Sequence, residues 1–177
     1  MAPCAGCGFE YETVALEEVG PAIVAGAVAL GAVVAAGGAA VRARPSPLVW
    51  SALEYACHVR DVLLVQRERI LLGLRAEAPA LVPMGRDERV EHDGYGEQDP
   101  RDVARQLDDA ALLFTRLFGR LSASELARTV IYNFPAPAER TLAWLGVHTV
   151  HEVVHHLADG RAALASGSDR HRPVTGP

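Results

Sequence analysis

Four of the seven histidines lie within nine residues, in the segment 148–156 with the sequence HTVHEVVHH. A helix turns about 100° per residue, so His148, His151 and His155 would share one stripe, whereas His156 would lie off it. Two imidazoles four residues apart on a helix can reach a common metal ion. The spacing therefore predicts a metal site on this helix, with His151 and His155 as ligands.

The same segment contains an H-E-x-x-H pattern, formed by His151, Glu152 and His155. In zinc metalloproteases this pattern supplies two ligands and a glutamate that acts as general base. A helical pair of histidines with a glutamate between them also arises by chance. The pattern alone therefore leaves Glu152 with two roles open, as a general base or as a residue that orients a ligating imidazole.

A third ligand has to come from another element, and His58 is the candidate, in the middle of a strongly helical segment. One histidine from one helix and a pair from another is a common way to build a metal site in a bundle. Three imidazoles leave coordination positions open for water or substrate. The alternative to a metal site is that the row of histidines in segment 148–156 simply faces solvent. Val150 and Val153 lie roughly opposite His155 on the helix, which would place the histidines on the outer side. Cys57, next to His58, is expected to point away from it and to pack in the core.

Cys4 and Cys7 form a C-x-x-C motif, which is half of a typical zinc site. The sequence has no second C-x-x-C, so the cysteines would either join the predicted histidine site or pair with His148 or His156 at a second site. A closed Cys/His set would be structural and would leave no position for catalysis. Two other interpretations stay open: a redox dithiol, although no βαβ setting is predicted, and a disordered head with incidental cysteines.

The elements that position these residues are predicted from apolar periodicity. Long helices are expected over about residues 13–37, 47–75, 99–117 and 138–164. Ser46 with Pro47, and Asp99 with Pro100, are predicted to start the second and third helices. Between the long helices, the sequence predicts a polar loop at 84–98, a capping box at Ser122–Glu125 and an extended segment at 129–137. Four long helices predict an all-α four-helix bundle.

Composition and charge exclude several classes of protein. The chain has 177 residues, half of them hydrophobic and 6% aromatic, which suits one domain with a core of Ala, Val and Leu. A net charge of −5 and the lack of a dense basic run argue against nucleic-acid binding. Residues 19–41 carry no charge, but their Ala- and Gly-rich composition favours a buried core helix over a membrane span. Three cysteines without a basic signal region predict a cytoplasmic location.

Two segments carry a resemblance to a known family. Residues 50–61, with the sequence WSALEYACHVRD, resemble the second helix of the DinB-like superfamily, and residues 148–159 resemble its closing helix with an H-x-x-x-H pair. The resemblance covers about residues 13–165. It leaves a Cys-containing head at 1–12, which many relatives lack, and a tail at 166–177 that is expected to be disordered.

The resemblance implies an up-down-down-up four-helix bundle and a metal triad formed by His58, His151 and His155. The implied ion is zinc, with nickel as the alternative, completed by water. The superfamily includes mycothiol-dependent maleylpyruvate isomerases and related thiol transferases. The resemblance therefore implies a transferase or isomerase in which the metal activates a low-molecular-weight thiol such as mycothiol toward a small electrophilic substrate.

Two alternatives to this function remain open at the level of sequence. Water could take the place of the thiol, which would make the protein a metal-dependent hydrolase. Cys4 and Cys7 could instead complete a structural zinc site in a non-catalytic protein. The small residues of the first helix would also permit a homodimer. Side chains that could assist catalysis are Glu152 and Asp159 at the ligands, and Arg60, Arg86 and Arg89 at an anionic substrate.

Overall fold

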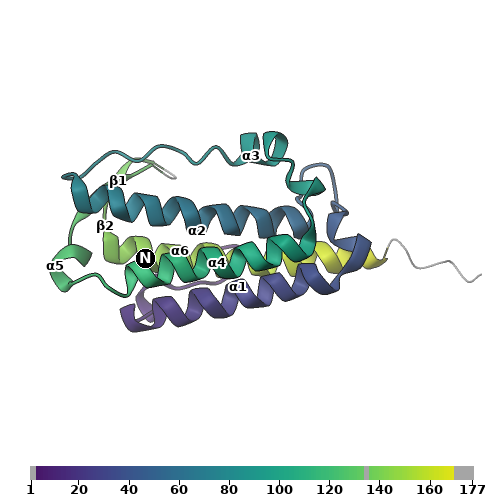
Figure 1. Cartoon of the computed structure of the whole chain (residues 1–177), viewed down its shortest axis with the longest axis horizontal. Coiled ribbons are helices and arrows are strands. Elements are labelled where there is room, and N and C mark those ends of the chain that lie inside the picture. The colour runs from purple at the N-terminus through teal and green to yellow at the C-terminus, as the bar shows by residue number, and fades with distance from the viewer. Residues whose placement is uncertain (1–2, 134–135, 170–177) are drawn as a thin grey trace, which may run out of the picture.

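Four long helices form a bundle in the computed structural model, which describes residues 3–133 and 136–169. They are α1 (Val19–Ala36), α2 (Ala52–Arg75), α4 (Pro100–Phe118) and α6 (Leu142–Asp169). Helices α1 and α6 run in one direction and α2 and α4 in the other (Figure 1). Both α1 and α2 pack mainly against α4 and α6. The predicted up-down-down-up four-helix bundle is confirmed.

Shorter elements connect these helices. Two 3-10 turns (Tyr11–Thr13 and Leu16–Glu18) precede α1, and a third (Gly38–Arg42) follows it. The connection from α2 to α4 contains α3 (Arg86–His92) and a 3-10 turn (Tyr95–Glu97). The connection from α4 to α6 contains α5 (Ala123–Leu126) and an antiparallel hairpin of β1 (Thr129–Tyr132) and β2 (Ala138–Thr141).

The capping signals predict some helix starts and miss others. The Asp99 side chain accepts hydrogen bonds from the first backbone N–H groups of α4, and Ser122 caps α5, both as predicted. Helix α2 begins at Ala52 and not at Pro47, because Ser51 and Glu54 form a reciprocal capping box. Arg44 binds the same glutamate carboxylate and fixes the preceding turn.

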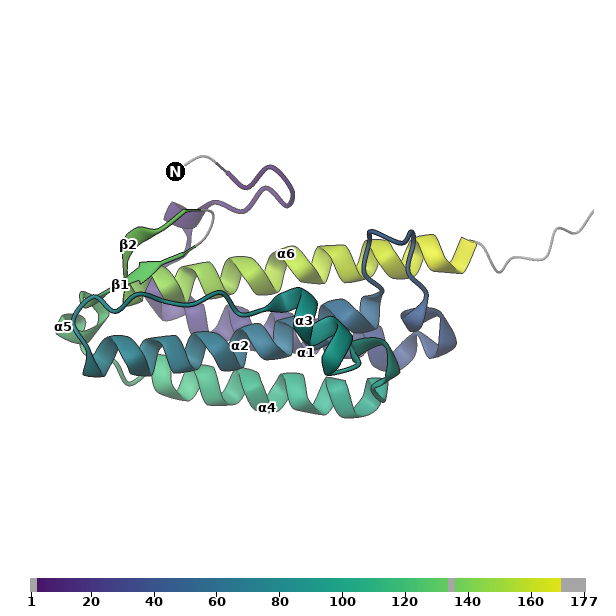
Figure 2. The same cartoon turned by 90° about the horizontal axis from the view of Figure 1, so that it is seen from above.

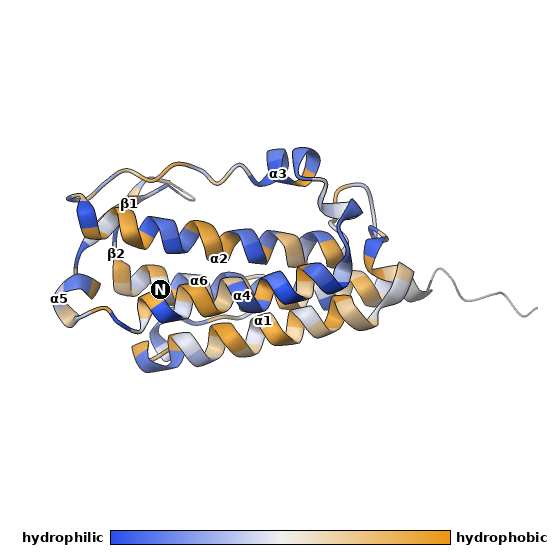
Figure 3. Ribbon diagram, in the orientation of Figure 1, coloured by the Kyte–Doolittle hydropathy of each residue, from blue (hydrophilic) through white to orange (hydrophobic). Residues whose placement is uncertain are grey.

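Three other predicted segments also differ from the structure. Helix α6 begins at Leu142, since residues 138–141 pair with β1 instead of continuing the helix. The predicted loop at 84–98 contains the helix α3, which is mostly hydrophilic (Figure 3). At the C-terminus α6 continues to Asp169, into the predicted tail, and residues 170–177 lie outside the described part of the chain.

Helix α1 is the apolar helix that the composition predicts to be buried. Among the described residues, Leu16–Ala36 is the one helical stretch long and apolar enough to cross a membrane. In the bundle one side of α1, with Ile23 and Leu30, is buried in the core, whereas Val24 and Val28 on its other side are exposed, so the helix is only partly buried. A Cβ atom on Gly26 would lie 2.4 Å from Cγ1 of Val153, so this glycine permits the close approach of α1 and α6. This contact holds the Val153 side of α6 against α1.

A buried ionic cluster attaches the α2–α4 connection to α2. One carboxylate oxygen of Asp61 accepts a hydrogen bond from Arg60 Nε at 2.7 Å. The other accepts from the Tyr95 hydroxyl at 2.6 Å and from Arg89 Nη1 at 3.1 Å. Burial opposes ionisation of Asp61, but Arg60, Tyr95 and Arg89 hold its pKa below the usual range. Arg60 and Arg89 are therefore engaged in holding the fold together.

The N-terminal segment from residue 3 to the first 3-10 turn lies along the outer side of α6, beside the hairpin (Figure 2). Cys57, by contrast, is fully buried in the core, where desolvation raises the pKa of its thiol to about 12. Cys57 therefore packs in the core as predicted, and the remaining two cysteines are brought to α6.

Candidate metal centre

Two of the i, i+4 pairs of potential ligands on helix α6 meet donor atoms from other segments of the chain: Glu152 with His156, and His151 with His155. Glu152 and His156 face α2, where their donor atoms and one from His58 all lie within 4.8 Å of one another. We call these three residues the inner site. Two imidazoles and a carboxylate form a ligand set that is used by catalytic zinc ions.

The polar partners of the inner site orient its donor atoms. Asp159 accepts a hydrogen bond from Nδ1 of His156 at 2.9 Å. Nε2 of His156 lies 3.6 Å from an oxygen of Glu152. A carboxylate behind an imidazole is the usual support for a metal-binding histidine. Nδ1 of His58 is buried and has no hydrogen-bond partner among the described residues, which leaves this nitrogen available to a metal ion.

Electrostatics also favour a cation at the inner site. Burial lowers the pKa of His58 to about 4, so its imidazole is neutral at pH 7 and can donate a lone pair. Burial opposes the charge on His156, but Asp159 and Glu152 raise its pKa to about 9, so the site favours positive charge and a bound metal ion would take the place of the proton on this imidazole. Burial also opposes the charge on Glu152, yet His151 and His156 hold its pKa well below the usual range. The carboxylate is thus an anion facing a buried space.

A small cavity adjoins the inner site. It has a volume of about 30 Å³, is lined by Glu152, Tyr132, Gln66 and Arg69 among others, and has room for about two water molecules. An open groove of about 460 Å³ between α2 and residues 81–84 shares Arg69 with this cavity. The groove therefore lies next to the cavity that Glu152 lines.

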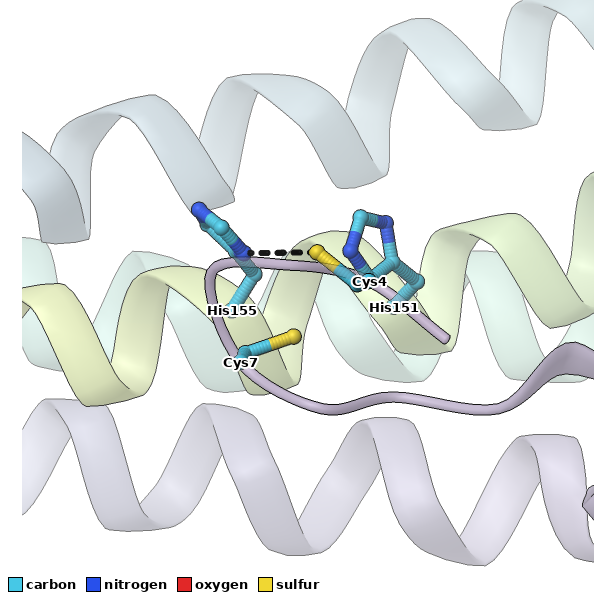
Figure 4. A group of neighbouring side chains, drawn as sticks. All are labelled: Cys4, Cys7, His151 and His155. Carbon is cyan, nitrogen blue, oxygen red and sulfur yellow. Dashed lines mark hydrogen bonds between the residues drawn. The ribbon is translucent and has the colours of Figure 1, made fainter. Parts of the chain in front are cut away.

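The second pair of ligands on α6, His151 and His155, faces the N-terminal segment. Their donor atoms and the thiols of Cys4 and Cys7 all lie within 4.8 Å of one another (Figure 4). We call these four residues the thiolate site. The Cys7 backbone N–H and the His151 side chain lower the pKa of Cys4 to about 6, whereas burial raises the pKa of Cys7.

Tyr11 connects the head to the histidine helix. Its hydroxyl lies 2.8 Å from Nδ1 of His148 and 3.2 Å from Nδ1 of His151. Nε2 of His148 contacts the Tyr132 hydroxyl at 3.0 Å, and its ring stacks on Trp144. Both nitrogens of His148 are thus hydrogen-bonded, which gives this buried histidine a packing role.

The described residues do not gather the predicted triad at one point. His58 lies beside His156, with ring centroids 4.8 Å apart, whereas His151 and His155 join Cys4 and Cys7. The face of α6 that meets α2 is therefore displaced by one residue from the predicted one. Sequence reasoning placed His156 off the metal stripe and gave Glu152 a supporting role, whereas the structure puts both donors beside His58. It also missed Tyr11, for which the sequence offers no spacing signal.

Of the three arginines predicted near a substrate, Arg86 alone has a guanidinium that is not bound to the buried carboxylate of Asp61. It lies over the ring of Trp50, at 5.9 Å from the centroid, and Trp50 in turn contacts His58 at a centroid distance of 5.2 Å. Arg86 is thus the predicted arginine that lies at the outer end of the inner site.

Comparisons with known proteins agree with this architecture. The structure is similar to that of a protein described as "YfiT from Bacillus subtilis is a probable metal-dependent hydrolase with an unusual four-helix bundle topology", with a TM-score of 0.68. The sequences are 19% identical, and the match covers 90% of each chain. No curated protein matches the sequence. The family model of the DinB superfamily matches residues 25–159, which is most of the chain and contains every residue of the inner site. The chain therefore belongs to the DinB superfamily.

Proposed function

We propose that this protein is a metal-dependent enzyme whose zinc ion is held by His58, Glu152 and His156. The observation that carries the proposal is the convergence of three donor atoms from α2 and α6 within 4.8 Å. Three protein ligands leave one tetrahedral position open, which is the arrangement of catalytic zinc sites. Nickel, which also accepts imidazole ligands, is the alternative ion.

The reaction proposed is hydrolysis of a small substrate. A zinc ion bound here would supply Lewis acidity and lower the pKa of a bound water. Asp159 fixes the tautomer of His156 so that Nε2 faces Glu152. The water-sized cavity beside Glu152 provides the place for a nucleophile. The description of the Bacillus subtilis protein as a probable metal-dependent hydrolase agrees with this proposal.

The groove next to the cavity indicates the class of substrate. Its walls combine apolar side chains, such as Leu72 and Leu81, with three arginines and one carboxylate, those of Arg69, Arg75, Arg89 and Glu68. Such a lining suits a small molecule with an anionic group and an apolar body. Arg69 also lines the cavity, and an anion bound there would compete with the carbonyl of Val82, to which Arg69 donates at 2.7 Å.

Thiol transfer is the second candidate, and the size of the groove favours it. A volume of about 460 Å³ falls in the range of small-molecule sites and would admit a low-molecular-weight thiol such as mycothiol. The thiolate would then replace water as the nucleophile. A reducing compartment would keep such a thiol and the protein's own cysteines reduced, so we propose a cytoplasmic location.

The test is a pair of histidine variants assayed on the zinc-loaded protein. His58→Ala removes a ligand, and His92→Ala removes an exposed histidine of α3 as the matched control. A panel of small anionic carboxylic and phosphoric esters would be tested with and without mycothiol. We expect activity to fall at least about 100-fold in His58→Ala and to stay unchanged in His92→Ala. Equal activity of the two variants would refute the proposal, and activity that requires mycothiol would favour transfer over hydrolysis.

A further inference from the structure

The C-x-x-C motif forms a tight turn that presents both thiols to α6. The backbone N–H of Gly8 donates to the carbonyl of Cys4 at 2.8 Å, and the N–H of Cys4 donates to the carbonyl of Phe9 at 2.9 Å. Gly8 has φ of 72°, a left-handed conformation that suits glycine. Both sulfur atoms point toward the histidines of α6 (Figure 4). The turn therefore places the thiols of Cys4 and Cys7 side by side, facing the histidines of α6.

One pair of donor atoms in the thiolate site has the separation found in a zinc tetrahedron. Usual Zn–S and Zn–N bond lengths place a sulfur and a nitrogen ligand about 3.6 Å apart. Sγ of Cys4 lies 3.7 Å from Nδ1 of His155. All four donors lie within 4.8 Å of one another, so small side-chain movements would bring them to one ion.

Each histidine of the thiolate site has one nitrogen supported and the other directed to the thiols. Nδ1 of His151 contacts the Tyr11 hydroxyl, while its Nε2 is buried without a hydrogen-bond partner in the described part of the chain. Nε2 of His155 lies 3.5 Å from a carboxylate oxygen of Asp159, while Nδ1 faces Cys4. Support of the distal nitrogen is how proteins orient metal-binding imidazoles.

We propose that Cys4, Cys7, His151 and His155 bind a zinc ion in a closed tetrahedral site, separate from the inner site, that fastens the N-terminal segment across α6. The filled site would hold two thiolates and two neutral imidazoles, so its charge with the zinc ion is neutral. Four protein ligands leave no position for a substrate, and the ion is structural.

This second ion would support the histidine helix from outside. The rings of His155 and His156 are neighbours, with centroids 5.1 Å apart, and Asp159 contacts both. Fixing His155 therefore limits the movement of Asp159, which orients a ligand of the inner site. The two proposals use different ligands, so one can fail while the other stands.

The experiment combines zinc content with cobalt spectroscopy, on wild type and three variants whose helix content is checked by circular dichroism. The double variant Cys4→Ser/Cys7→Ser removes both thiols of the site, and Cys57→Ala removes the core thiol as the matched control. His156→Ala removes a ligand of the inner site only. In the cobalt-substituted protein, thiolate ligands give an intense near-ultraviolet charge-transfer band that imidazole and carboxylate ligands do not give.

We expect the double variant to lose one zinc ion and the charge-transfer band, and Cys57→Ala and His156→Ala to keep that band. A wild type that binds one zinc, with a band unaffected by His156→Ala, would support this site while contradicting the proposed inner site. The inference would be overturned by a wild type without the band, by a band that survives the double substitution, or by one that His156→Ala also abolishes.

Discussion

Gly6 lies between the two cysteines, and replacing it with alanine tests the geometry of the thiolate site. A Cβ atom built on Gly6 would lie 2.8 Å from Cε1 of His155. The backbone of Gly6 is not in the left-handed region, so alanine meets no conformational strain there. The consequence of the substitution therefore depends on whether the imidazole ring of His155 is free to move.

The size of the required movement can be worked out from the contact. The ring of His155 has to shift by about 0.6 Å to lengthen 2.8 Å to the 3.4 Å of ordinary van der Waals contact. In the metal-free protein such a shift of a side-chain end costs little. In the zinc-bound protein it exceeds the tolerance of about 0.2 Å on metal–ligand distances. We expect zinc to bind at least about tenfold more weakly, which corresponds to about 1.4 kcal/mol.

The assay is competition for zinc with a chromogenic chelator, together with thermal unfolding with and without zinc. Gly20→Ala is the matched control, because its Cβ would lie at an ordinary 3.8 Å from Thr115. We expect Gly6→Ala to unfold like wild type without zinc and to gain less stability from zinc. Wild-type zinc affinity in Gly6→Ala would refute the reasoning, since it would mean that a bound ion does not fix His155.

Three further predictions concern stability. Tyr11→Phe keeps the aromatic ring but leaves Nδ1 of His148 without its hydroxyl partner, so the free energy of unfolding of the metal-free protein should fall by about 1–3 kcal/mol. Denaturant unfolding measures this loss, and an unchanged midpoint would contradict the role of the hydroxyl. Asp61→Asn should cost about 3–5 kcal/mol at pH 7, because it breaks a buried ion pair. The pKa of Asp61 is lower in the folded state, so its contribution to stability is present above its usual pKa of 3.8 and is lost as the pH falls through the folded-state pKa. The free energy of unfolding of the Asp61→Asn variant should therefore depend less on pH in this acidic range than that of wild type. Parallel pH profiles of the two proteins would argue against this role of Asp61. Gly26→Val should destabilise by about 1–3 kcal/mol or more, because a Cβ there would meet Val153 at 2.4 Å, and wild-type stability would show that the α1–α6 contact is loose.

The sequence was sufficient to predict the fold but not the rotation of α6. Apolar periodicity and the resemblance both predict four helices in the observed order. His151 with His155, and Glu152 with His156, have the same i, i+4 spacing, and the two pairs differ by about 100° around the helix. The choice between them depends on which sides of α6 pack against α1 and α2, and this tertiary feature is not revealed by the sequence pattern.

The cysteines show the same limit at the N-terminus. C-x-x-C spacing predicts half of a zinc site with histidines as candidate partners, and the structure places His151 and His155 beside the two thiols. The spacing does not predict that the C-x-x-C turn packs against α6, because a short segment before the first helix has no periodicity from which its path could be predicted. Tyr11, which holds the segment against His148 and His151, was missed for the same reason.

The most direct test of the inner site is to locate the ion itself. Crystals of the zinc-loaded protein would be measured at the zinc absorption edge, where anomalous scattering places each ion without reference to the protein ligands. Our account predicts a peak bonded to His58, Glu152 and His156. An ion bonded instead to His58, His151 and His155 would contradict it, because α6 would then have to be rotated by one residue.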